Sequence, residues 1–281
     1  MSFSRRSFLF CMGATAFFTA AGLGVAPSSA AGVMPLASHM AVYDLSLADG
    51  GGNRAPVSAK GRIAFQFTGS ACEGYVMNFR QLTEVQPLTG ALRVSDVRSS
   101  TYEDGQAKAY SFRTQTFING VSAQKVDGSA RKPSEGALLI DLSSPQKKKL
   151  DVDKSVAFPT EQIERILDAA RAGRSTLQMK VFDGSDTGQK IYNTLAVIGR
   201  PATTPPADKA AKHGILKTMR RWPVSISYFD SDKQDSAPEY VLSFDLYENG
   251  VSGSLKLNYG DFTLDGELTH FRILPQSGCS R

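Results

Sequence analysis

The stretch DGSDTGQK, Asp183–Lys190, combines carboxylates, small residues and a lysine, which are the residue types of a phosphate-binding loop. Its two glycines lie too close together, and a glutamine stands before the lysine, so the spacing is not that of a P-loop. Asp183 and Asp186 could bind a cation, but the EF-hand spacing is absent. We therefore expect a turn in which Asp and Ser side chains bond to their own backbone.

Other residues that serve catalysis are also present without a catalytic spacing. His39, His213 and His270 lie far apart and form no HExxH pattern, so no metal site is expected. Ser252 lies between Gly250 and Gly253, which is not the G-x-S-x-G spacing of a hydrolase. The sequence therefore favours a protein that is not an enzyme and needs no metal or cofactor. An unrecognised hydrolase of the cell wall is kept as the last-ranked alternative.

The first 30 residues have the three parts of an export signal. Arg5 and Arg6 precede an uncharged apolar stretch, Phe8–Ala26, and a small-residue cleavage site ends at Ala30. We predict that residues 1–30 are removed and that the mature chain is periplasmic; an N-terminal membrane anchor is the alternative. The paired arginines resemble the twin-arginine pattern, and the choice between that route and the general secretory route is left open.

Cysteine usage follows from this prediction. The chain has three cysteines, and Cys11 leaves with the signal, so that Cys72 and Cys279 remain. An even pair in an exported protein indicates a disulfide, and no CxxC motif suggests a redox or zinc site. A bond between residues about 200 positions apart would stabilise the fold by at most ~5 kcal/mol in the chain-entropy view.

Charge gives little indication of a charged partner. The whole chain has a formal net charge of +5, and its basic clusters, Lys147–Lys149 and Arg220–Arg221, are expected to be solvated loop charges. Aromatic and basic residues do not alternate as they do on a nucleic-acid platform, so no nucleic acid is expected as a partner. No apolar run of membrane-spanning length follows the signal, so no transmembrane segment is expected in the mature chain.

The elements that must position any site are mostly strands. Apolar residues alternate with polar ones in about a dozen runs bounded by turns, which is typical of half-buried antiparallel sheet. Asn249–Gly250 predicts a type I′ turn between two of these runs. The stretch 158–174 has helical spacing, with Thr160 as the expected cap and Gly173 as the stop. Residues 200–214 are rich in Pro, Ala and Lys and predict a flexible loop.

Six stretches together resemble the EipB-type cell-envelope integrity proteins of the bacterial periplasm. They run in order over nearly the whole mature chain: Leu36–Leu47, Cys72–Arg80, Phe158–Gln162, Phe182–Tyr192, Arg220–Asp230 and Leu257–Leu268. The resemblance implies a single antiparallel β-spiral, a broken barrel of a dozen or more strands with one amphipathic helix, over residues 31–281. It also implies that Cys72 pairs with Cys279. Candidates for a binding or structural motif are Asp183, Gly184, Ser185, Asp186 and Trp222.

Two functions fit these expectations. The first is a non-enzymatic periplasmic protein that maintains cell-envelope integrity by binding a periplasmic protein partner. The second is a carrier of lipid or lipopeptide that uses the concave face of the sheet, because inward Phe, Leu and Tyr residues could leave a ligand cavity. A packed interior would favour the first function, and an open apolar cavity would favour the second.

Overall fold

The computed structural model describes residues 34–48, 55–133, 137–152, 155–231 and 237–276. The predicted export signal, residues 1–30, and Cys279 lie outside these ranges. Residues Met34–Arg281 form one compact unit. No helix in the described part of the chain is long and apolar enough to cross a membrane.

The described residues form one antiparallel sheet of fourteen strands in the order β8-β7-β6-β5-β4-β3-β2-β1-β14-β13-β12-β11-β10-β9. The strands are β1 (His39–Leu47), β2 (Ser58–Ser70), β3 (Gly74–Gln86), β4 (Arg93–Glu103), β5 (Ala109–Ile118), β6 (Val121–Arg131), β7 (Leu138–Ser144), β8 (Lys148–Val152), β9 (Thr176–Val181), β10 (Tyr192–Ile198), β11 (Arg221–Asp230), β12 (Tyr240–Tyr247), β13 (Ser252–Asn258) and β14 (Thr263–Ile273). The helices are α1 (Pro159–Arg171) and the short 3₁₀ helices η1 (Ala210–Lys212) and η2 (Gly214–Lys217). The predicted single antiparallel sheet of a dozen or more strands, a broken barrel with one α-helix, is confirmed.

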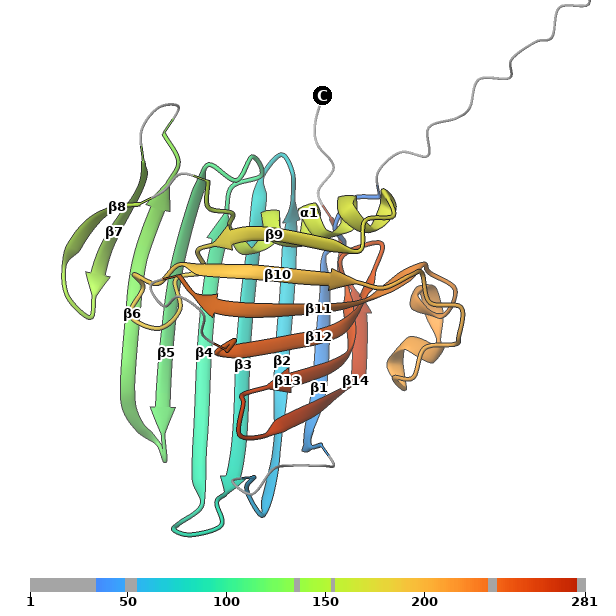
Figure 1. The fold of residues 1–281 in the computed structure, drawn as a ribbon, viewed down its shortest axis with the longest axis horizontal. Coiled ribbons are helices and arrows are strands. Elements are labelled where there is room, and N and C mark those ends of the chain that lie inside the picture. Colours follow the sequence, from blue (N-terminus) through green and yellow to red (C-terminus); the bar gives the residue numbers. More distant parts are fainter. Residues whose placement is uncertain (1–33, 49–54, 134–136, 153–154, 232–236, 277–281) are drawn as a thin grey trace, which may run out of the picture. The chain divides into compact units, whose positions relative to one another are not determined.

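The first and last strands pair at the middle of the sheet, and the sheet curls so that its two halves face each other. In Figure 1, strands β2–β5 run from top to bottom, and β9–β12 cross in front of them. Hydrogen bonds join the halves: Tyr43 Oη donates to the Ser252 carbonyl at 2.7 Å, and Gln81 Nε2 donates to Tyr259 Oη at 3.2 Å. We call β1–β8 the N-terminal half and β9–β14 the C-terminal half.

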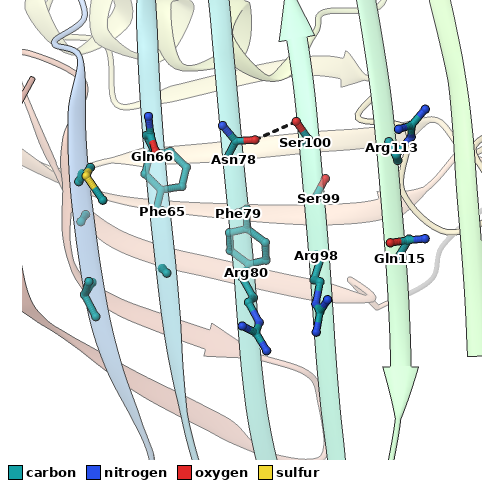
Figure 2. Close-up of a pocket in the computed structure, with 14 residues that line it drawn as sticks. Phe65, Gln66, Asn78, Phe79, Arg80, Arg98, Ser99, Ser100, Arg113 and Gln115 are labelled. Carbon is teal, nitrogen blue, oxygen red and sulfur yellow. Dashed lines mark hydrogen bonds between the residues drawn. The ribbon is translucent and has the colours of Figure 1, made fainter. Parts of the chain in front are cut away.

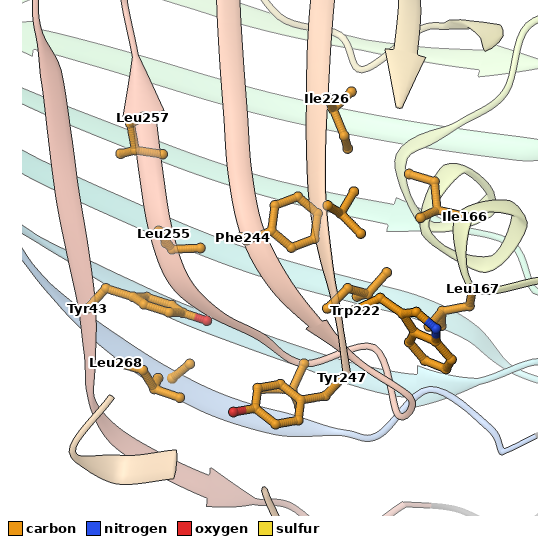
Figure 3. Packing of buried hydrophobic residues seen from close by; sticks show 14 of the residues in the cluster. Tyr43, Ile166, Leu167, Trp222, Ile226, Phe244, Tyr247, Leu255, Leu257 and Leu268 are labelled. Carbon is orange, nitrogen blue, oxygen red and sulfur yellow. The ribbon is translucent and has the colours of Figure 1, made fainter. Parts of the chain in front are cut away.

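The main core joins α1, the C-terminal half and the strands β1–β3 (Figure 3). Trp222 on β11 is 2% exposed and lies in the same cluster as Ile166 and Leu167 of α1 and Leu246 and Tyr247 of β12. Burying a large apolar side chain stabilises a fold by roughly 1.5–3 kcal/mol. The only tryptophan of the chain therefore has a packing position.

A second core closes the region where the edge strand β9 approaches the N-terminal half. Phe158 lies 5.2 Å from Tyr110, measured between ring centroids, and Phe182 packs edge-on against Phe112 at 5.5 Å. Ala157 forms a parallel bridge with Val181, so part of the edge of β9 is covered.

Helix α1 ends as the sequence predicts but begins differently. Its N-cap is Phe158, so the prediction that Thr160 caps the helix is wrong. Glu161 Oε2 instead accepts a hydrogen bond of 3.2 Å from the Phe158 N–H. Gly173 follows the C-cap with a φ of 70°, as the sequence predicts.

Two of the basic clusters have positions that the sequence did not predict. Lys148 and Lys149 belong to the edge strand β8, where lysines discourage pairing with another chain. Arg221 is 5% exposed, and its Nε lies 2.9 Å from Asp245 Oδ2. The lysines are exposed as expected, but Lys148 and Lys149 lie on a strand and not in a loop; the expectation of a solvated charge is wrong for Arg221.

The segment 200–214 crosses the surface between β10 and β11 and is anchored at Asp208. The Asp208 carboxylate accepts hydrogen bonds from the Ser254 N–H at 2.8 Å and from the Leu268 N–H at 2.9 Å. Ala211 and Leu216 are fully buried beside this anchor. Flexibility of the rest of this loop stays a prediction.

Candidate binding site

An apolar cavity of about 300 Å³ lies between the two halves of the sheet. We call it the inner cavity. Its lining residues come from β1–β4, the start of α1, β12, β13 and two connecting segments: Leu36, His39, Tyr43, Ile63, Phe65, Phe67, Met77, Phe79, Gln81, Thr101, Pro159, Thr160, Ile163, Tyr240, Leu242, Phe244, Asn249, Gly250, Ser252, Leu255 and Leu257.

The wall from the N-terminal half follows from alternation along two paired strands. Phe65 and Phe67 on β2 lie opposite Phe79 and Met77 on β3. Because side chains alternate between faces, these four point to the inner face, while Gln66 and its cross-strand partner Asn78 point outward. They are half-buried, so each keeps apolar surface that a ligand could cover.

The facing wall comes from β12 and β13. Leu242 and Leu257 are directly paired between these strands, and Phe244 and Leu255 continue the surface (Figure 3). Tyr240 lies 5.4 Å from Tyr259 between ring centroids, and burial raises the pKa of its hydroxyl well above the ordinary value. This wall is therefore uncharged near neutral pH.

The first turn of α1 contributes Pro159, Thr160 and Ile163 to the lining. Glu103, at the end of β4, holds this turn in place, because its carboxylate oxygens accept hydrogen bonds from the Thr160 N–H at 2.7 Å and the Glu161 N–H at 2.9 Å. Burial raises the pKa of Glu103 to about 7, and the two hydrogen bonds oppose this effect only in part.

A polar corner of the inner cavity contains His39 and Asn249. The His39 ring is 3% exposed, and its Nδ1 lies 2.7 Å from the Ala37 carbonyl, so Nδ1 carries the hydrogen. Burial lowers the pKa of His39, which keeps the ring neutral at neutral pH. Asn249 is 2% exposed and belongs to the connection between β12 and β13.

The outer face of the N-terminal half carries a shallow groove of about 420 Å³ (Figure 2). Asp96 accepts hydrogen bonds from both Arg80 and Arg98 there, and these bonds lower the pKa of its carboxyl to about 2. Asn78 accepts a hydrogen bond of 2.9 Å from the Ser100 hydroxyl. We call this hollow the outer groove; the polar residues that line it are Gln66, Asn78, Arg80, Arg98, Ser99, Ser100, Arg113 and Gln115.

The motif at 183–190 lies in the connection between β9 and β10 and packs against the second core. Asp183 Oδ1 accepts a hydrogen bond of 2.9 Å from the Ser185 N–H, which forms the expected turn. The backbone carbonyl of Asp183 accepts a hydrogen bond of 3.0 Å from Tyr110 Oη. Gly184 faces the Phe112 ring so closely that an added Cβ would lie 2.4 Å from it. Burial raises the pKa of Asp183.

The predicted candidates are thus not brought together in one site. Asp183, Gly184, Ser185 and Asp186 do not line the inner cavity, and neither does Trp222. Cys72 is exposed in the turn between β2 and β3, and its pairing with Cys279 stays a prediction. Within the described ranges, no three His, Cys, Asp or Glu side chains are grouped as metal ligands would be.

The cavity residues were not predicted as a site, although the pattern held a signal for them. Large aromatic side chains repeat on the inner face of β2 and β3, where smaller residues would suffice to cover a packed core. Which half of the sheet faces them depends on contacts between distant parts of the chain.

Comparison with known proteins indicates the family. A sequence model of EipB-like proteins matches residues 30–275. The chain belongs to the EipB-like family. It is 36% identical over 275 residues to the cell envelope integrity protein EipB of Brucella abortus (strain 2308), a match that covers 96% of each chain. It is also similar to the crystal structure of a beta-barrel-like protein of the DUF1849 domain from Brucella abortus, with a TM-score of 0.81 and 33% identity, covering 86% of this chain and all of the other.

Proposed function

We propose that this protein maintains the integrity of the cell envelope by binding the acyl chain of a lipid or lipopeptide in the inner cavity, without catalysing a reaction. A relative covering almost the same length is named a cell envelope integrity protein, which supports the envelope role. The observation that supports an acyl ligand is the apolar lining of the inner cavity, with phenylalanines on both facing walls.

The size and chemistry of the cavity fit one apolar chain. Its volume of about 300 Å³ is at the lower end of small-molecule sites. Each methylene moved from water into such a site contributes roughly 0.8 kcal/mol. A chain of six to eight methylenes would therefore gain about 5 kcal/mol or more before the costs of binding are subtracted.

Native mass spectrometry of the protein purified from the periplasm tests this proposal. We expect a mass above that of the mature chain, with the excess released on unfolding and identified as an acyl-containing molecule. A clean mass of the mature chain, combined with no binding of added lipid, would contradict the proposal. The same spectrum would check cleavage of residues 1–30 and the loss of two hydrogens expected for a disulfide between Cys72 and Cys279, both of which we retain as part of the proposal.

Binding of a periplasmic protein partner is the second candidate, and the outer groove favours it. The side chains of Arg80 and Arg98 are 54% and 51% exposed, and Asp96 fixes both guanidinium groups in place. Fixed arginines lose less conformational freedom when they bind the carboxylates of a partner. Affinity capture with the wild type and with Arg98→Glu would test this role: a partner retained only by the wild type supports it, and a partner set that the substitution leaves unchanged excludes the groove.

The envelope role is tested in the cell. A deletion strain should lose tolerance to detergents and to antibiotics that act on the envelope, and the wild-type gene should restore it. Normal tolerance in the deletion strain would contradict the envelope role independently of either binding mode.

A further inference from the structure

The side-chain amide of Asn249 is buried in the polar corner of the inner cavity with one of its two ends unused. Its Oδ1 accepts a hydrogen bond of 3.2 Å from the Val251 N–H, which fixes the orientation of the amide. Its Nδ2 is buried and has no hydrogen-bond partner within the described ranges. Leaving such a donor unpaired costs about 1–3 kcal/mol.

This unpaired donor is distinguished by its position. Arg171 Nε and Tyr247 Oη are the other two buried side-chain polar atoms without a hydrogen-bond partner in the described part of the chain. Neither of these residues lines the inner cavity, whereas Asn249 does. The residue that carries this unpaired donor therefore lines the space that we assign to a ligand.

The charge of the corner limits what the acceptor can be. No Lys, Arg, Asp or Glu is among the described residues that line the inner cavity. His39 is kept neutral by burial, and its Nδ1 hydrogen is used by the Ala37 carbonyl. An ionised carboxylate or phosphate would lose its hydration there without gaining a cation, which is strongly unfavourable. A neutral carbonyl needs only one donor.

We infer that the inner cavity selects an acyl ester or acyl amide, with the ligand's carbonyl oxygen accepting a hydrogen bond from Asn249 Nδ2 and its alkyl chain lying along the phenylalanine walls. This inference rests on the proposed function, since it names the class of ligand for the same cavity. It excludes the free fatty acid, which is ionised at neutral pH, as the preferred form.

The test compares three probes of equal chain length, methyl dodecanoate, dodecane and dodecanoate, by displacement of a fluorescent apolar probe. The wild type should bind the ester about tenfold more tightly than the alkane, which corresponds to a net hydrogen bond of ~1.4 kcal/mol. Dodecanoate at pH 8 should bind more weakly than the ester. Asn249→Ser should bring the ester-to-alkane ratio to about one and leave the affinity for dodecane within twofold.

A matched control and a second variant keep the outcomes distinct. Asn258→Ser removes an asparagine whose Oδ1 makes the same kind of turn contact, with the Gly260 N–H at 2.8 Å, outside the cavity, and should keep the wild-type ratio. If Asn249→Ser fails to fold, Asn249→Ala removes the donor without adding a charge to the corner and should bind the ester no better than the alkane. Equal affinity of the wild type for ester and alkane, or tighter binding of dodecanoate, would overturn this inference alone. Failure of all three probes to bind would overturn the proposed function.

Discussion

The carboxylate of Glu103, on β4 of the N-terminal half, accepts a hydrogen bond of 2.7 Å from the backbone N–H of Thr160 in the first turn of α1. The two residues are 57 positions apart in the sequence, and the contact holds the helix over the inner cavity. A carboxylate at this end of a helix is favoured by the helix dipole, but burial opposes its charge. The contact therefore links the protonation of one residue to the position of one wall of the site.

The contribution of Glu103 to stability should fall as the pH rises from about 4.5 to about 7. The folded protein keeps the proton of Glu103 up to a pKa of about 7, whereas the unfolded chain releases it near the ordinary value of 4.5. At Glu103 the native state thus binds an extra proton in this window, and the contribution of this residue to stability decreases by on the order of 3 kcal/mol across it. Glu103→Gln should flatten the dependence of Tm on pH in this range.

Other groups facing Glu103 define the control for this experiment. Glu161 lies beside it and is paired with Lys132, whose Nζ is 2.5 Å from Glu161 Oε2. Glu84→Gln, which changes a surface ion pair with Lys60, should leave the pH profile as in the wild type. A profile for Glu103→Gln that matches the wild type would show that Glu103 does not titrate in this window.

Filling the inner cavity should abolish acyl binding without unfolding the protein. Leu242→Trp places a larger side chain in the cavity from β12, and we expect at least a tenfold loss of affinity for an acyl ester with a change in Tm of only a few degrees. Val197→Trp, at a residue that is 49% exposed on β10, is the matched control and should bind as the wild type does. Equal affinities of the two variants would show that the ligand binds elsewhere.

Gly184 should be intolerant of any side chain because the 183–190 turn packs on the second core. Gly184→Ala combines a φ of 68° with a Cβ only 2.4 Å from the Phe112 ring, and should cost about 3 kcal/mol in urea denaturation. Gly260→Ala has a φ of 87° but no atom within 4 Å, and should cost only about 1 kcal/mol. Similar losses for both variants would mean that the turn does not pack against Phe112.

The disulfide prediction gains support from the position of Gln276, three residues before Cys279. Its Nε2 donates to the Gly69 carbonyl at 3.0 Å, and Gly69 lies three residues before Cys72. Alkylation of unreduced periplasmic extract should leave both cysteines unlabelled. Cys279→Ser should lower Tm, because the free energy of unfolding should fall by up to ~5 kcal/mol. Labelling of both thiols would exclude the bond, and an unchanged Tm would exclude a stabilising role.

Local patterns predicted the elements well where one face of a strand is apolar. The strands β2, β3 and β12 show this alternation, whereas β6 and β8, with the sequences VSAQKVDGSAR and KKLDV, lack a clear apolar face. The type I′ turn expected at Asn249–Gly250 is wrong, since only Gly250 has a positive φ there. Asn119–Gly120, between β5 and β6, has two positive φ values and fits that turn type.

The site itself depends on contacts that no local pattern contains. Glu103 supplies the helix contact expected of a local cap, and Phe65 and Phe79 line a cavity only because β12 and β13 cross above them. The sequence predicts a turn at Asn249, and its Oδ1 does accept a hydrogen bond within that turn. The significance of its unpaired Nδ2, however, depends on the neighbouring cavity. These features arise from the curl of the sheet.

The affinity of the wild-type protein for a series of methyl esters of increasing chain length tests the central claim most directly. If the chain is buried in the inner cavity, the Kd should fall about fourfold for each added methylene, and should level off once the cavity is full. The same Kd for short and long chains would contradict acyl binding in the inner cavity.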